Sequence, residues 1–167
     1  MSVRRVAHEV VRLEVPVAAP WAEFRARYER AVPELAGEEL ARLVTAGASW
    51  DEVRASAEAT APHGFLRYWG TDVGPLMSLA APARPCVEYL MGNHTIAQRM
   101  FVHRPGVMLY APLRTSIYED AAGETWFTVD QPSTRFAGFG DPAVAAVGRE
   151  LDEKLAALLA HLGAPLI

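Results

Sequence analysis

Alternating apolar and polar residues mark the first part of the chain. Over residues 6–15, apolar side chains at positions 11, 13 and 15 alternate with Arg12 and Glu14. A two-residue period is typical of a strand with one buried face. The pattern therefore predicts a first strand over residues 6–15.

Three later stretches have the three-to-four-residue spacing of amphipathic helices. The first begins at Pro20, and the last is a long helix over residues 142–162. Between them, residues 37–62 predict a pair of short helices, the second opened by a capping box made by Ser49 and Glu52. We interpret this pair as a helical insert that either covers one end of a sheet or moves as a lid.

Beyond Gly64 the period becomes that of strands, with short turns containing Gly or Pro between them. Asp120 to Gly123 predicts a hairpin loop, and residues 95–103 predict one short helix. Pro112 would remove a ladder donor and favours an edge position or a bulge. The predicted strands are residues 65–69, 73–79, 86–91, 107–118 and 125–129.

This order of elements predicts a single α+β domain over residues 1–167. Its two layers are a mostly antiparallel sheet and a set of helices on one face, with the long C-terminal helix lying across the sheet. The chain has 51% hydrophobic and 22% charged residues, as ordinary globular proteins do.

Charge and hydropathy reduce the number of expected partners. Net charge is -4 and the arginines are scattered, so no basic stripe predicts nucleic-acid binding. No apolar run approaches the roughly 18 residues of a membrane span, and no signal-peptide pattern follows the first residues. We expect a cytoplasmic protein without a membrane partner. The single cysteine, Cys86, is expected to be a small buried hydrophobe.

The segment Asn93-His94-Thr95 joins a predicted strand to the short helix and is the strongest candidate for chemistry. Asn93 and Thr95 are both good helix caps, and the amides beyond them form a positive pole suited to a carboxylate or phosphate. His94 at this pole could give or take a proton near neutral pH. A capping loop without any ligand is the alternative interpretation.

Two further polar residues are candidates because they occupy strand and turn positions beside aromatic side chains. Arg114 would share a strand face with Met108 and Tyr110, either as a clamp for an acidic group or as half of an ion pair with Asp130 or Glu88. Asp130 is a candidate acid or base, although Asp beside Ser and Pro is also ordinary turn chemistry.

Metal and cofactor signals are weak. The five histidines show no HxH or HExxH spacing and no pairing with the cysteine, so we expect no metal site. A haem is compatible with the spacing because it needs only one axial histidine and an apolar pocket. Phosphate-loop, dinucleotide and nucleophile-elbow motifs are missing from the sequence, and we expect no other cofactor.

Several ordered blocks resemble a known family. YLMGNHTIAQRM, PGVMLYAPLRTSIYED, GETWFTVDQPS and FGDPAVAAVGRELDEKLAALL together resemble domain-of-unknown-function family 302, from about residue 87 to the C-terminus. The resemblance implies a compact α+β fold of the TATA-binding-protein-like or helix-grip class, and a homodimer. His94 stands where the family commonly has Pro. The N-terminal strand followed by Ala-Pro-Trp is similar to START-like helix-grip proteins, which bind apolar ligands or act as polyketide cyclases.

These patterns together predict a small-molecule-binding domain with an apolar pocket and a polar end for an anionic or carbonyl group. One alternative is a cofactor-independent isomerase, lyase or cyclase with His94 as acid or base, and a second is a haem-binding or protein-interaction module. The expected catalytic residues are His94, Arg114 and Asp130. The expected ligand-binding residues are Asn93, Thr95, Trp69, Met77, Tyr89, Met108 and Tyr110.

Overall fold

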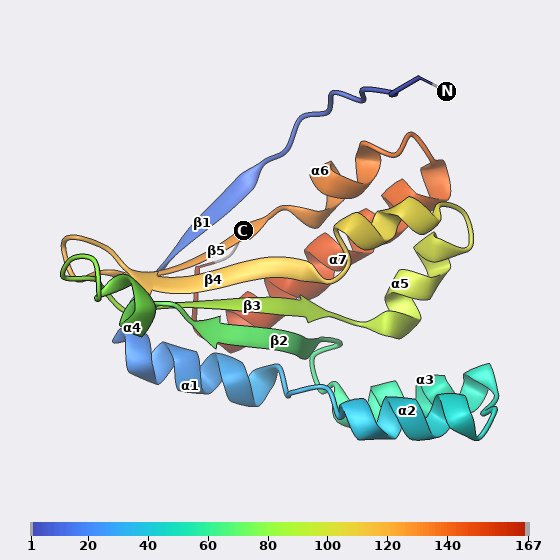
Figure 1. Cartoon of the computed structure of the whole chain (residues 1–167), viewed down its shortest axis with the longest axis horizontal. Coiled ribbons are helices and arrows are strands. Elements are labelled where there is room, and N and C mark those ends of the chain that lie inside the picture. The colour runs from blue at the N-terminus through green and yellow to red at the C-terminus, as the bar shows by residue number, and fades with distance from the viewer. Residues whose placement is uncertain (1, 166–167) are drawn as a thin grey trace.

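One open, five-stranded antiparallel sheet forms the framework of the protein. The computed structural model describes residues 2–165, and within them the strand order is β1-β5-β4-β3-β2. The sheet does not close into a barrel, and β1 and β2 form its two edges (Figure 1). The strands are β1 (Arg12–Val17), β2 (Leu66–Asp72), β3 (Cys86–Gly92), β4 (Leu113–Glu119) and β5 (Thr125–Asp130).

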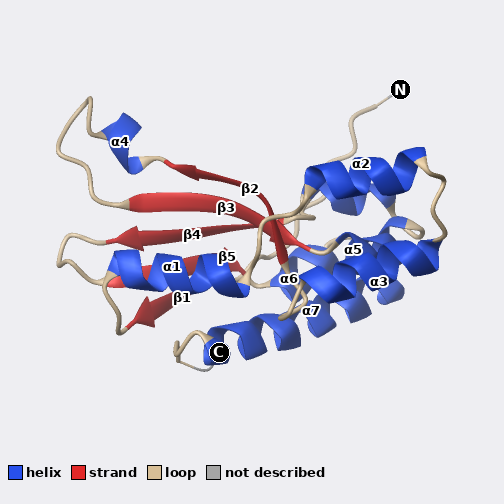
Figure 2. Ribbon diagram, turned by 90° about the horizontal axis from the view of Figure 1, so that it is seen from below, coloured by secondary structure: helices blue, strands red, loops and turns tan. Residues whose placement is uncertain are grey.

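Helices cover one face of this sheet and gather at one of its ends. In Figure 1, α7 passes behind the strands, and in both views α2, α3, α5 and α6 lie toward one end while α4 lies at the opposite end (Figures 1 and 2). The helices are α1 (Trp21–Ala31), α2 (Gly37–Thr45), α3 (Trp50–Thr60), α4 (Gly74–Met77), α5 (His94–Phe101), the 3-10 helix η1 (Pro105–Leu109), α6 (Pro132–Ala137) and α7 (Pro142–His161).

The core lies between the sheet and the helices α1 and α7. Successive strand residues point to opposite faces, so alternate residues of β3, β4 and β5 are buried against the helices. Tyr28 of α1 is fully buried, and its hydroxyl lies 3.2 Å from Thr115 Oγ1 on β4. Leu155, in the C-terminal half of α7, is also fully buried. The predicted α+β class is thus confirmed.

Local capping chemistry fixes several element boundaries where the sequence predicted them. Ser49 and Glu52 form the predicted capping box at the start of α3. The carboxylate of Asp141 accepts hydrogen bonds from the first amides of α7. In the hairpin loop, Asp120 Oδ1 accepts hydrogen bonds from the amides of Ala122 and Glu124.

Three predicted strands differ from the structure. β1 begins only at Arg12, and the residues before it form no strand. Val6 and Val11 in this segment are exposed, so the apolar residues of the alternating pattern are not buried there. Residues 73–79 contain the short helix α4, with Pro75 in its first turn, where its fixed φ suits a helix. The missed signal was the proline inside the apolar run.

The predicted strand over residues 107–118 is divided into η1 and β4. Pro112 lies just before β4, so it removes no donor from the ladder, and β4 is central in the sheet rather than at an edge. The turn predicted after β5 includes the helix α6, which starts at Pro132. The Ser133 amide, in the first turn of α6, donates a hydrogen bond of 2.9 Å to Asp152 of α7. The N-terminus of α6 is thus capped by a residue of another helix.

Within residues 2–165, every helix is too short or too polar to cross a lipid bilayer.

Replacing Leu155 with Ala tests the central role of α7. The substitution removes a fully buried side chain from the interface with the sheet, and we expect a loss of about 3 kcal/mol in the free energy of unfolding. Leu109→Ala is a matched control because that leucine is 75% exposed. Urea denaturation of both variants measures the difference, and equal midpoints would contradict the proposed packing.

Candidate functional site

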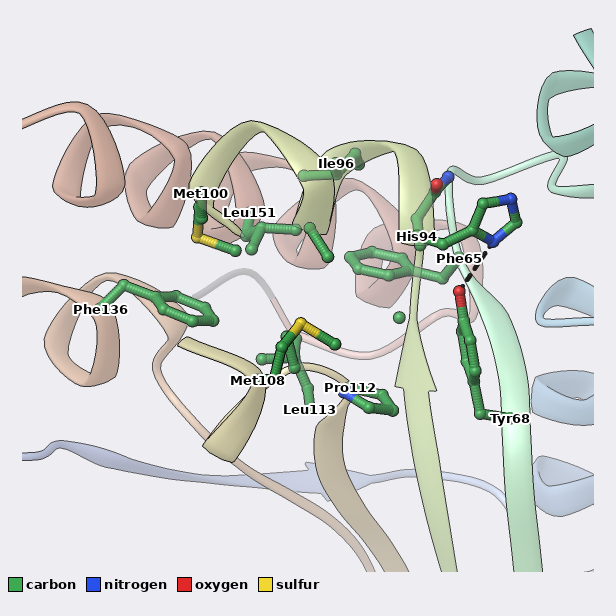
Figure 3. A pocket seen from close by; sticks show the side chains of 14 residues that line it. Phe65, Tyr68, His94, Ile96, Met100, Met108, Pro112, Leu113, Phe136 and Leu151 are labelled. Carbon is green, nitrogen blue, oxygen red and sulfur yellow. Dashed lines mark hydrogen bonds between the residues drawn. The ribbon is translucent and has the colours of Figure 1, made fainter. Parts of the chain in front are cut away.

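A small cavity lies beneath α5, and we refer to it as the α5 cavity. Its volume is about 60 Å³, which is room for roughly four to six water molecules. It is bounded by the sheet, by α5 and by the helices that close this end of the molecule (Figure 3). Residues that line it include Phe65, Tyr68, His94, Ile96, Met100, Met108, Leu113, Phe136 and Leu151.

A hydrogen-bonded pair, Tyr68 and His94, forms one side of the α5 cavity. The Tyr68 hydroxyl lies 2.9 Å from His94 Nδ1, and Figure 3 shows both rings on the side opposite Met100 and Phe136. The sheet register shifts between Arg67 and Trp69, which leaves Tyr68 without a partner on β3. This β-bulge turns the Tyr68 side chain toward the start of α5, as bulges often do beside sites.

Burial sets the protonation states of this pair. Burial lowers the pKa of His94 and raises the pKa of Tyr68 to about 12. At neutral pH the imidazole is therefore neutral and the phenol keeps its proton. Among the residues that the structure describes, none provides a hydrogen-bond partner for the buried His94 Nε2. Figure 3 shows Nε2 on the side of the ring that points away from the other lining side chains, whereas Nδ1 is engaged by Tyr68.

The rest of the cavity wall is apolar and partly adaptable. Ile96 and Met100 lie one turn apart on α5 and point to the same side. Met108 is 49% exposed and so contributes to the mouth of the cavity. Gly92 lets Pro112 approach closely, since a Cβ built on Gly92 would lie 3.0 Å from Pro112 Cβ.

Three of the predicted site residues line the α5 cavity: Asn93, His94 and Met108. Asn93 caps α5 as predicted, with Oδ1 accepting from the Thr95 amide at 2.9 Å and from the Thr95 hydroxyl at 2.7 Å. Its Nδ2 donates to the Gly64 carbonyl at 3.1 Å. The polar groups of Asn93 and the Thr95 amide are thus used within the protein, so the helix start offers less to an anion than predicted.

Arg114 and Asp130 lie on the opposite face of the sheet from His94. Leu113 faces the helices and the α5 cavity, so the next residue, Arg114, points away from them. Arg114 forms an ion pair with Glu88 at 2.5 Å, one of the two partners considered from the sequence. Asp130 pairs instead with Arg135. Strand alternation thus prevents Arg114 from acting together with His94 on one ligand.

The other predicted lining residues lie elsewhere. Tyr110 shares a separate hollow of about 230 Å³ with Arg114 and Asp130. Trp69 and Tyr89 line a third hollow at the other edge of the sheet. Met77 belongs to α4 at the far end of the sheet and is 54% exposed. Five residues that line the α5 cavity were not predicted as site residues from the sequence: Phe65, Tyr68, Met100, Phe136 and Leu151.

Metal-binding side chains are not gathered in the described part of the chain, where no group of three or more His, Cys, Asp or Glu residues is close enough to hold an ion. Cys86 is half-buried, and burial together with nearby Asp72 and Glu88 raises the pKa of its thiol. The thiol therefore stays protonated at neutral pH, which disfavours metal binding and nucleophilic chemistry.

The family model for the domain of unknown function DUF302 matches residues 43–162. The chain belongs to the DUF302 family. The match begins well before residue 87, so the helix α3 and the strand β2 that carries Tyr68 lie inside the family region. A comparison with curated proteins gives no match.

A solved DUF302 structure has the same fold. It is described as the crystal structure of an uncharacterized conserved protein DUF302 from Bacillus stearothermophilus, and it is 18% identical to this chain with a TM-score of 0.65. The similarity covers 90% of this chain and 97% of the other. At this identity the comparison supports the fold, and the function has to be argued from the site.

The lowered pKa of His94 makes a testable contribution to acid sensitivity. His94 binds a proton more weakly in the folded state than in the unfolded state, in which its pKa is about 6.5. His94 therefore stabilises the fold above that pH, and this contribution is lost as the pH falls below it. We expect His94→Gln to show a smaller drop in melting temperature between pH 7.5 and pH 5 than the unmodified protein.

Two details sharpen the measurement. Burial and the neighbouring His161, whose ring centroid is 4.0 Å away, also lower the pKa of His63, so some acid sensitivity persists in His94→Gln. His103→Gln is a control, since His103 is exposed at the surface. An unchanged pH dependence in His94→Gln would contradict the assignment of His94 as a neutral, buried imidazole.

Proposed function

We propose that this DUF302 protein binds a small, mainly apolar molecule with one hydrogen-bonding group in the α5 cavity. The observation that carries the proposal is an apolar cavity of about 60 Å³ with the buried Tyr68–His94 hydrogen bond at its wall. The polar groups of Asn93 are used within the protein, so Tyr68 and His94 are the side chains of this wall that a hydrogen-bonding group of a ligand would contact.

The dimensions and lining of the cavity support a small ligand. A volume of 60 Å³ is well below the roughly 300–1,000 Å³ of sites for drug-sized molecules. Met100 and Met108 have flexible, polarizable side chains that can adapt to the shape of a guest. A haem does not fit this space, because the cavity is far too small for a macrocycle.

Acid–base catalysis at the same cavity is a second proposal, favoured by the His94–Tyr68 hydrogen bond. A neutral imidazole that is hydrogen-bonded to a protonated phenol can pass a proton to or from a bound substrate. This arrangement would suit a cofactor-independent isomerase or lyase. Native mass spectrometry of the purified protein separates the two proposals in part, because a tightly retained ligand favours binding over turnover.

Phenol is a suitable probe because it has an apolar ring and a single hydroxyl. Titration into protein with labelled methionine methyl groups should give saturable shifts at Met100 and Met108. We expect Ala97→Leu to weaken binding at least tenfold, because Ala97 lines the cavity and the larger side chain fills it.

Ala160→Leu is the matched control, since Ala160 is exposed near the end of α7. It should bind phenol as the unmodified protein does. Toluene tests the polar contribution, and we expect it to bind more weakly than phenol. Equal binding of phenol by Ala97→Leu and the unmodified protein would show that the α5 cavity is not the binding site.

A further inference from the structure

A second pocket lies between α1 and the edge strand β2, and we refer to it as the α1–β2 pocket. Its volume is about 150 Å³, and none of its lining residues lines the α5 cavity. β2 is the last strand on this side of the sheet (Figure 1). Charged side chains dominate the wall: Arg25, Glu29, Glu34, Arg67 and Asp72, next to Trp69 and Tyr89.

Three of these charged residues, Arg25, Glu29 and Asp72, form hydrogen-bonded ion pairs with one another at the floor of the pocket. Arg25 donates from Nε to Glu29 at 3.1 Å and from Nη1 to Asp72 at 2.7 Å. The Tyr89 hydroxyl donates to Glu29 Oε1 at 2.5 Å. Burial opposes ionisation of Glu29, but the hydrogen bonds from Tyr89 and Arg25 lower its pKa overall. The network is therefore ionised and fixed. Arg67 forms no hydrogen bond with it but acts on it as a nearby positive charge that also lowers the Glu29 pKa, and Glu34 lies outside it.

Arg67 is a half-buried arginine that forms no ion pair within residues 2–165. Its Nε donates to the Val32 carbonyl at 2.8 Å, and its guanidinium lies 5.6 Å from the centroid of the Tyr89 ring. Its backbone is held as well, through hydrogen bonds of 2.8 Å to Pro33 and Leu35. Arginines in such positions normally have an anionic partner, so the fixed guanidinium is suited to a carboxylate.

Glu34 supplies the opposite charge on the adjacent segment. It is bridged to Arg67 through the backbone, yet within the described chain its carboxylate forms no ion pair with Arg67 or any other basic group. The guanidinium cannot turn to Glu34 without leaving Val32 and the Tyr89 ring. One pocket wall thus presents a cation that is fixed by Val32 and Tyr89 and an exposed anion that is not paired with it.

The shape of the pocket restricts what can enter. The Arg25–Asp72 ion pair spans from α1 to β2, and the backbone bridge between Glu34 and Arg67 covers the strand edge at another point. These contacts leave a short pocket rather than a groove for an extended peptide. Its five charged residues are two arginines and three carboxylates, a formal sum of -1, which disfavours a simple anion.

Gly70 keeps the aromatic floor in place. A Cβ on this residue would lie 2.6 Å from a ring carbon of Tyr89, so only glycine allows the ring to lie against β2. Trp69, which is 48% exposed, adds an apolar surface at the rim.

We propose that the α1–β2 pocket binds a small zwitterion of the amino-acid class. The carboxylate of the ligand pairs with the Arg67 guanidinium, its ammonium group pairs with Glu34, and its side chain contacts Trp69. Recognition of both charges uses the two charged groups of the pocket that form no ion pair within residues 2–165, and it selects against molecules that carry only one of the charges.

Three matched probes test the proposal by calorimetric titration. L-Norvaline carries both charges, pentanoate lacks the ammonium group, and butylamine lacks the carboxylate. We expect L-norvaline to bind at least tenfold more tightly than either of the other two. Pentanoate or butylamine binding as tightly as L-norvaline would overturn the zwitterion assignment, and so would a failure of all three to bind.

Substitutions locate the site. Arg67→Gln and Glu34→Gln should each weaken L-norvaline binding at least tenfold, whereas Arg30→Gln and Glu38→Gln, at exposed positions outside the pocket, should leave it unchanged. Arg67→Gln also loses a hydrogen bond to Val32 and could unfold for that reason. In that case Glu34→Gln decides the test, because the Glu34 side chain is exposed. Unchanged affinity in Glu34→Gln would contradict the proposal. Ala97→Leu, which fills the α5 cavity, should not affect L-norvaline binding.

Discussion

Burial of one face of the sheet against α1 and α7 is the interaction on which the rest of the structure depends. Tyr28, Phe127 and Leu155 are fully buried at this interface. Fully burying a side chain of this size contributes roughly 1.5–3 kcal/mol, and the contributions repeat along the whole helix. Because α7 is fixed on the sheet in this way, its residue Asp152 can accept the hydrogen bond from Ser133 at the start of α6. For the same reason Leu151 of α7 lies in the wall of the α5 cavity.

The α5 cavity exists because of irregularities at the end of this framework. The bulge at Tyr68 breaks the ladder between β2 and β3, and Gly92 ends β3 with no side chain at the point where Pro112 approaches. Regular pairing would have filled this space with alternating side chains. The break in pairing costs stability locally, and the result is a hydrogen-bonded Tyr68–His94 pair next to an apolar space.

The two proposed sites use different physical means of recognition. The α5 cavity offers mainly apolar contact beside the Tyr68–His94 pair, so its selectivity depends on shape. The α1–β2 pocket offers fixed charges, so its selectivity depends on the sign and spacing of charges on the ligand. Both are attached to the same rigid sheet, and membership of the DUF302 family is consistent with either.

The sequence by itself determined the fold class, the helices α1, α5 and α7, the capping box of α3 and the position of His94 at a helix start. These features follow from periodicity and capping, which are local properties. It did not determine which face of the sheet each side chain occupies relative to distant helices. Arg114 was expected beside His94, yet strand alternation places it on the other face with Glu88. The partnership of Tyr68 with His94, and the unpaired state of Arg67, arise from a bulge and a backbone bridge between distant segments. Such contacts depend on how the layers pack, and only the tertiary structure decides them.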